Sequence, residues 1–91
     1  MSYSKSSLFN PETRVQLEEI IHHRIPHSNT HWIPSTKSLS VNLPHIGSID
    51  IEVGQEPLVY VSSLVSIKYQ DDINDCLTTV KRAVGDWIER Q

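Results

Sequence analysis

Cysteine, glycine and basic residues are scarce in this chain of 91 residues, and each scarcity excludes a class of protein. The single cysteine, Cys76, excludes a framework of intramolecular disulfides and fits a reducing compartment. The three glycines, Gly47, Gly54 and Gly85, are too dispersed for a phosphate-cradling loop. The chain also lacks the G-x-S-x-G motif of a nucleophilic serine. We therefore expect no enzymatic activity and no cofactor.

Long apolar segments are missing as well. No run approaches the ~20 residues that a membrane span requires, and the Ser-rich start lacks the apolar stretch of a signal peptide. The sequence therefore predicts a cytoplasmic protein that makes no membrane contact. We expect one small domain over residues 1–91, with a loose tail over residues 1–7.

The hydrophobic period changes along the chain, and this change predicts the fold class. From Ser38 to Val53 apolar and polar residues alternate, which is typical of strands with one buried face. From Ile73 to Ile88 apolar residues recur at steps of three and four, which is typical of a helix lying on a sheet. We expect an α+β domain of order α-β-β-β-α. Its antiparallel sheet has three or four strands, and both helices pack on one face.

A first helix is expected from Pro11 to about Arg24. Asn10 supplies a cap, and Pro11 is favoured at the first helical position. Pro26 ends the helix, because its ring clashes with the carbonyl group four residues earlier. The residues predicted to face the core are Leu17, Ile20 and Ile21.

A hairpin follows, with strands around Leu39–Leu43 and Ile49–Val53 and a turn at residues 44–47. A short strand around Trp32 is compatible with the pattern, but Pro34 restricts it to a sheet edge. For the last helix, Asp71 and Asp72 offer N-terminal caps. Its predicted buried stripe consists of Ile73, Cys76, Leu77, Val80, Val84, Trp87 and Ile88. Within that stripe Cys76 is a small buried residue rather than a nucleophile.

The segment from Leu58 to Tyr69 is long for one strand of a small domain. One phase, expected to face the helices, consists of Val59, Val61, Val65, Ile67 and Tyr69. The other phase includes Leu58, Tyr60 and Leu64, where a solvated sheet face would be polar. Two interpretations remain open. In the first, the segment breaks near Ser62 and Ser63 into two short strands, or its second face is covered internally. In the second, Leu58, Tyr60 and Leu64, with Trp32, form a self-association or partner surface.

Four of the five histidines lie between residues 22 and 31, at His22, His23, His27 and His31. A spacing of four would align the last three on one helix face, but Pro26 prevents that helix. We expect no metal site, because structural zinc sites need four Cys or His ligands. Solvated loop histidines and a pH-sensitive surface are the two other interpretations.

The order helix, three antiparallel strands, helix is similar to that of double-stranded-RNA-binding domains, and the turn containing Pro44 and His45 falls where that family places a histidine-bearing loop. The resemblance implies a Lys-rich start to the last helix that grips phosphates. Here that start carries Asp71, Asp72 and Asp75, and the whole chain has a net charge of −3. Direct binding of nucleic acid is therefore not expected.

These features favour a protein that binds another protein without catalysis, as an inhibitor, immunity factor, adaptor or chaperone-like subunit. The expected surface is a partly apolar sheet face containing Leu58, Tyr60 and Leu64, with Trp32. The acidic residues Asp71, Asp72 and Asp75 favour a basic partner. A homodimer through residues 58–69 is a further expectation. The alternative function class is a nucleic-acid-associated protein or a nucleic-acid mimic acting on a basic protein.

Overall fold

A computed structural model describes residues 10–52 and 56–90 and places two helices against one antiparallel sheet. The described elements, in chain order, are α1 (Pro11–Arg24), β1 (Asn29–Ile33), β2 (Ser38–Leu43), β3 (Gly47–Glu52), β4 (Leu58–Val61), the 3₁₀ turn η2 (Ile67–Tyr69) and α2 (Gln70–Glu89). This arrangement confirms the predicted α+β class and the four-stranded form of the sheet. The fourth strand also departs from the three-stranded order of double-stranded-RNA-binding domains.

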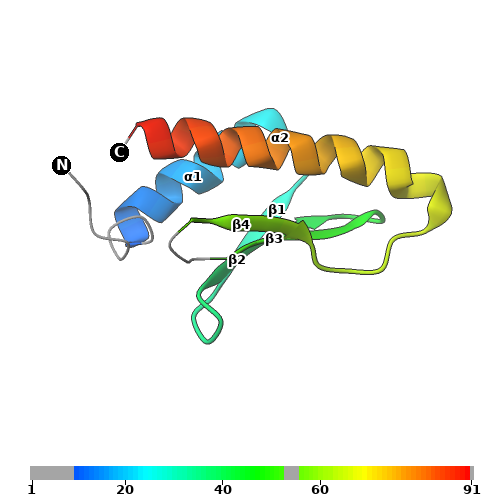
Figure 1. Cartoon of the computed structure of the whole chain (residues 1–91), viewed down its shortest axis with the longest axis horizontal. Helices are drawn as coiled ribbons and strands as arrows, with labels where there is room; N and C mark the ends of the chain where they lie inside the picture. Colours follow the sequence, from blue (N-terminus) through cyan, green and yellow to red (C-terminus); the bar gives the residue numbers. More distant parts are fainter. Residues whose placement is uncertain (1–9, 53–55, 91) are drawn as a thin grey trace.

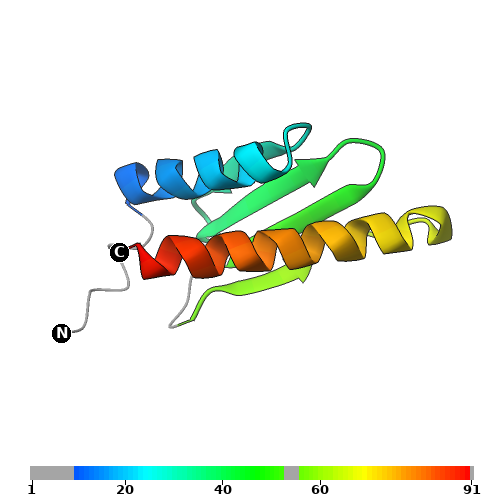
Figure 2. The same cartoon turned by 90° about the horizontal axis from the view of Figure 1, so that it is seen from above.

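The sheet has the strand order β1-β2-β3-β4, so every strand pairs with its neighbour in the sequence. Both helices lie on one face of it, as predicted (Figures 1 and 2). The register places Leu39 opposite Ile51 and Val41 opposite Ile49, and all four side chains are fully buried beneath the helices. Alternate residues face away from the helices, because successive side chains of a strand point to opposite faces.

Helix α1 forms as its sequence predicts. The side chain of Asn10 accepts a hydrogen bond of 2.9 Å from the N–H of Thr13, and Pro11 occupies the first turn. The helix ends at Arg24, and Ile25 is its C-cap residue. The residues of α1 that enter the core are the predicted ones, Leu17, Ile20 and Ile21.

Helix α2 begins one residue before the predicted caps. Asp71 and Asp72 lie in its first turn, and its N-cap residue is Tyr69, which makes no capping side-chain bond. The physical reason is the 3₁₀ turn, which leads directly into the helix and has already fixed the backbone. The buried residues of α2 are Ile73, Val80, Ala83, Val84 and Trp87, while Cys76, Leu77 and Ile88 are half-buried at the margins.

The long strand expected from Leu58 to Tyr69 is wrong beyond Val61. The chain breaks near Ser62 and Ser63, as one interpretation held, but the 3₁₀ turn η2 at Ile67–Tyr69 follows instead of a second strand. Ser62 still donates its N–H to the Ser48 carbonyl, whereas the N–H of Ser48 donates to the side chain of Ser63. Because the Ser63 hydroxyl takes this N–H, the ladder stops and the chain leaves the sheet.

Two further expectations on strands have different outcomes. The short strand around Trp32 is confirmed as β1, which lies at a sheet edge. Val53, predicted to end the second strand of the hairpin, lies outside the described residues. Among the helices of residues 10–52 and 56–90, none combines the length and the apolar character that crossing a bilayer requires.

Candidate functional site

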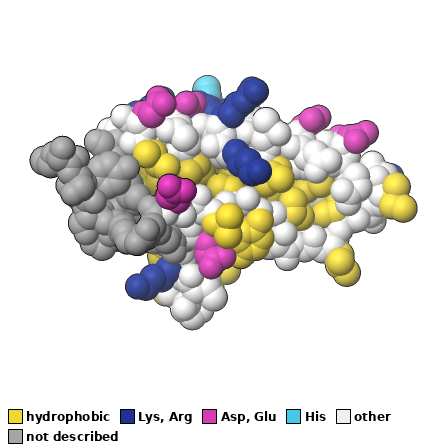
Figure 3. Space-filling view, viewed as in Figure 1, with side chains coloured by type: hydrophobic (Ala, Val, Ile, Leu, Met, Phe, Trp, Pro, Cys, Tyr) yellow, Lys and Arg dark blue, Asp and Glu magenta, His cyan; other side chains and the backbone are white. Residues whose placement is uncertain are grey.

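Two large apolar side chains project from the connection between β4 and α2. Leu64 is 101% exposed and Ile67 is 92% exposed, so neither contributes to the core. We call this pair the apolar tip. Apolar side chains stand out from the end of the molecule at which α2 begins (Figure 3). Leu64 was expected on a partner surface, but Ile67 was expected to face the helices, and that expectation is wrong because β4 has already ended.

Hydrogen bonds fix the backbone that carries the apolar tip. Before Leu64, the side chain of Ser63 accepts a bond of 2.9 Å from the N–H of Ser48 in β3. Around Ile67, the N–H of Tyr69 donates to the carbonyl of Ser66 over 2.9 Å. A contact surface that is already ordered loses little conformational entropy on binding. The apolar tip is therefore suited to inserting into a partner.

Three carboxylates lie beside the apolar tip, at the start of α2. Asp71, Asp72 and Asp75 are all exposed, and the first two lie in the first helical turn. Burial and then the charges of Asp72 and Asp75 raise the pKa of the nearby Cys76 thiol. The thiol is therefore held protonated near neutral pH, which does not suit a nucleophile. The same carboxylates make this end of the molecule attractive to a basic surface.

The sheet face away from the helices, expected to be partly apolar, carries mostly polar side chains on β2 and β3. Leu58, 58% exposed, and the half-buried Tyr60 lie next to each other along β4 at its margin. A hydrogen bond to Glu52, with burial and the negative charges of Glu52 and Asp50, raises the pKa of the Tyr60 phenol. The other side chains of β2 and β3 on this face include Ser40, Asn42 and Ser48. At the opposite edge of this face lies the half-buried Ile33 of β1, which pairs with Ser38.

Trp32 lies apart from the other predicted contact residues. It is on β1, at the opposite edge of the sheet from β4. Its register partner is Leu39, so its side chain lies on the helix-covered face. The guanidinium carbon of Arg14 in α1 stands 4.5 Å from the centre of the indole ring. The structure therefore brings Leu58 and Tyr60 together and places Trp32 on a different face.

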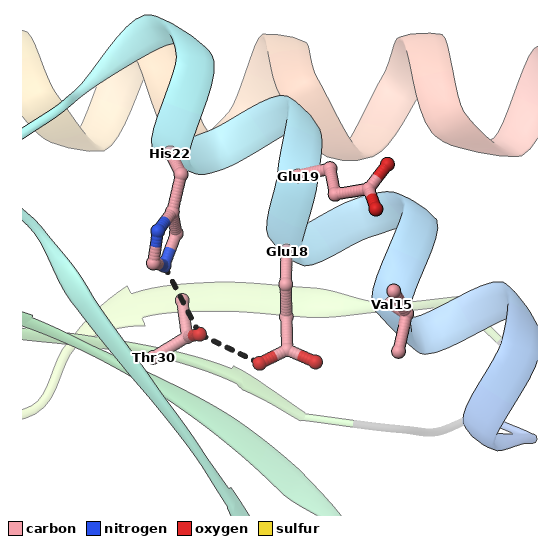
Figure 4. A pocket seen from close by; sticks show the side chains of 5 residues that line it. All are labelled: Val15, Glu18, Glu19, His22 and Thr30. Atoms are coloured by element: carbon pink, nitrogen blue, oxygen red, sulfur yellow. Dashed lines mark hydrogen bonds between the residues drawn. The ribbon is translucent and has the colours of Figure 1, made fainter.

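A small hollow of about 250 Å³ lies between α1 and β1 (Figure 4). The Thr30 hydroxyl donates a hydrogen bond of 2.6 Å to Glu18, so it accepts the 3.2 Å bond from the His22 ring. Both His22 and His23 lie on α1 rather than in a loop, whereas His27 follows the helix. Within residues 10–52 and 56–90, no three His, Cys, Asp or Glu side chains are arranged to hold a metal ion. The hollow is a hydrogen-bonded contact between helix and strand.

Comparison with protein-family models, with curated proteins and with solved structures found no match to this chain.

Proposed function

We propose that this chain is a small, non-enzymatic protein-binding module whose partner is a basic protein. The observation that carries the proposal is the complete exposure of Leu64 and Ile67 on a hydrogen-bonded segment. Neither side chain stabilises the fold, so their exposure has no structural benefit within the monomer. Burial of each in a partner would contribute about 1.5–3 kcal/mol.

The charge of the neighbouring helix start specifies the kind of partner. Asp71, Asp72 and Asp75 are exposed at the start of α2, which follows the apolar tip in the chain, and give this helix start a negative charge. The nearest cation along the chain, Lys68, stands 5.0 Å from the ring centre of Tyr69. An apolar pocket rimmed by Lys or Arg would complement both features. Carboxylates of this chain that meet such a basic rim chiefly accelerate association and select against acidic partners.

The test is site-specific crosslinking from the apolar tip. A photoreactive amino acid is placed at position 64, and in a matched control at Val15, which is 47% exposed on α1. Expression in the source organism, followed by mass spectrometry, should give one recurrent basic protein crosslinked from position 64 and not from position 15. The partner is then purified for titration calorimetry.

Affinity for that purified partner distinguishes specific docking from chance crosslinking. The double variant Leu64→Ser, Ile67→Ser should lower affinity by about 100-fold or more, because two buried aliphatic side chains are lost. Val15→Ser should leave affinity unchanged. Unchanged affinity of the double variant would overturn the proposal. Replacing Asp71, Asp72 and Asp75 by Asn should slow association and weaken its dependence on salt.

A further inference from the structure

Among the strands of residues 10–52 and 56–90, β4 has a neighbour on one side only, because it ends the order β1-β2-β3-β4. The N–H of Ser62 donates to the carbonyl of Ser48 in β3. Residues of an antiparallel pair alternate between bonding to the neighbour and facing away from it. Tyr60, two residues before Ser62, therefore bonds to β3, whereas Val59 and Val61 turn their N–H and C=O groups toward the open side. These four groups can form a ladder with an added strand.

Helix α2 carries apolar side chains on the flank above this open edge. Asp86 pairs with Arg24 of α1, which defines the flank of α2 that faces α1. Leu77, Val84 and Ile88 follow one another at steps of seven and four and lie on the opposite flank, since each residue turns the helix by about 100°. Leu77 and Ile88 are half-buried, so part of their surface remains exposed.

These side chains continue onto the helix-facing side of β4. Val59 and Val61 are half-buried and pair with Ile51 and Ile49 on the core side of the sheet. Together with Leu77, Val84 and Ile88 they form what we call the edge strip. Apolar side chains form a band between α2 and β4 (Figure 3). An added strand would bury its inward side chains against this strip.

The other side of the same edge is acidic. Tyr60 pairs with Asp50, and Leu58 pairs with Glu52, so both carboxylates are one strand away from the open edge. Asp50 accepts a hydrogen bond from Ser62, and within the described part of the chain neither Asp50 nor Glu52 forms an ion pair. Strands lie about 4.8 Å apart, so an extended Lys or Arg on an added strand can reach these carboxylates.

We propose that the β4 edge accepts an extended segment of a basic partner as a fifth strand, in which Lys or Arg alternates with aliphatic residues. The alternation follows from the period of two along a strand. Side chains opposite Val59 and Val61 enter the edge strip, and those opposite Tyr60 and Leu58 meet Asp50 and Glu52. Lys81, on the same flank of α2 as Leu77, favours aliphatic over basic side chains on the inner face. This proposal rests on the proposed function, to which it adds a second contact for a basic partner.

Charge favours such a segment over a second copy of this chain. Antiparallel pairing of β4 with its own copy would gather Asp50 and Glu52 of both molecules on one sheet face. Tyr60 would lie opposite its counterpart, with no cation of β3 or β4 in either molecule to offset the carboxylates. A strand bearing Lys or Arg neutralises these charges instead.

The experiment titrates the ¹⁵N-labelled full chain with a capped heptapeptide, Lys-Val-Arg-Val-Lys-Val-Lys. A control peptide has the same composition with its three Val residues in one block. The alternating peptide should bind at least 10-fold more tightly than the control. It should also slow amide exchange of Val59 and Val61 at least 10-fold, and replacing its Lys and Arg with Glu should abolish binding.

Backbone variants test whether strand addition is the mode. Val59→Pro removes an outward N–H that β3 does not use, and proline is tolerated at such edge positions. It should abolish binding, whereas Val59→Thr keeps the N–H and should retain binding within about threefold. If the proline variant does not fold, two N-methylated peptides make the same test on the unaltered protein. One peptide is methylated at its odd-numbered backbone nitrogens and the other at its even-numbered ones. Only the peptide whose methyl groups replace the N–H groups that face β4 should lose binding.

Three results would overturn the strand-addition proposal. They are equal affinity for the two peptides, retained binding by folded Val59→Pro, and a peptide-free dimer whose Val59 and Val61 amides are protected. The variant Leu64→Ser, Ile67→Ser separates this proposal from the proposed function, because it should leave peptide affinity unchanged. If peptide binding fails while the crosslinked partner still depends on the apolar tip, only strand addition is refuted.

Discussion

The indole N–H of Trp87 donates a hydrogen bond of 2.8 Å to the backbone carbonyl of Thr13. The two residues are 74 positions apart, at the end of α2 and the start of α1. Trp87 is fully buried, so its apolar ring fills the core while its one polar atom reaches a partner. This bond joins the two helices over the sheet.

Trp87 should therefore be a major determinant of stability. Trp87→Phe should lower the free energy of unfolding by about 1–2 kcal/mol, because the N–H and part of the ring are lost. Trp87→Ala should cost about 3–5 kcal/mol by leaving a cavity. Urea unfolding followed by circular dichroism measures both. Equal stability of Trp87→Phe and the wild type would contradict a stabilising role for the Thr13 bond.

Gly47 should be intolerant of a side chain. A Cβ atom there would lie 2.7 Å from the Ser63 hydroxyl oxygen and 3.1 Å from a methyl carbon of Val65. Gly47→Ala should therefore cost about 1–3 kcal/mol and displace the segment that carries Leu64. Gly85→Ala is the matched control, because nothing lies within 4 Å of its added Cβ.

The two alanine substitutions should change the free energy of unfolding in opposite directions. Gly85 lies inside α2, where alanine should stabilise the fold by about 0.5–1 kcal/mol. Chemical denaturation gives the two free energies, and backbone NMR shifts of Leu64 report the displacement. A Gly47→Ala variant as stable as wild type, with unmoved Leu64 shifts, would show that the contact with Ser63 relaxes freely.

The phenol of Tyr60 should lose its proton above the ordinary range for tyrosine. Its pKa is raised by the hydrogen bond to Glu52, by burial, and by the charges of Glu52 and Asp50. Glu52→Gln should lower this pKa, since it removes a negative charge, and Asp75→Asn should leave it unchanged. NMR titration of the Tyr60 ring measures the shift. An unaltered Tyr60 titration in Glu52→Gln would contradict the assigned cause.

Cys76 should react slowly with thiol reagents at neutral pH. Its pKa is raised by burial and by the charges of Asp72 and Asp75, so less thiolate is present than in a free cysteine. Replacing Asp72 and Asp75 with Asn should speed its reaction with an uncharged disulfide reagent at fixed pH. Added salt screens the aspartate charges and should therefore reduce the difference in reaction rate between variant and wild type. A slower reaction in the Asn variant would contradict the assignment of the raised pKa of Cys76 to Asp72 and Asp75.

The elements with regular periodicity were predictable from the sequence. Asn10 and Pro26 delimit α1, and the alternation from Ser38 onward gives the hairpin of β2 and β3. The break after Val61 was one of two interpretations that the sequence left open, because the alternating residues beyond it also match a strand, and the 3₁₀ turn η2 was not predicted. What ends β4 is the bond between the Ser48 N–H and the Ser63 side chain. Such a bond depends on tertiary contact and leaves no period in the sequence.

The candidate site was predictable in part for the same reason. Leu58 and Leu64 belong to the phase that should not face the helices, and both are exposed. Ile67 was missed, since its phase in a continuous strand points to the core. Trp32 is of a residue type that often anchors protein interfaces. Its place on the helix-covered face follows from its pairing with Leu39, which the sequence does not reveal. The homodimer and the basic partner stay predictions.

Sequential pairing of the four strands has a consequence for how the chain folds. Each hairpin closes a short loop, which costs little entropy, and no crossover has to be threaded. The sheet can thus form hairpin by hairpin from either end, while the hydrogen bond between Trp87 of α2 and Thr13 of α1 requires both helices to be present. A ribosome-bound chain would form that bond only after the last turn of α2, which carries Trp87, emerges.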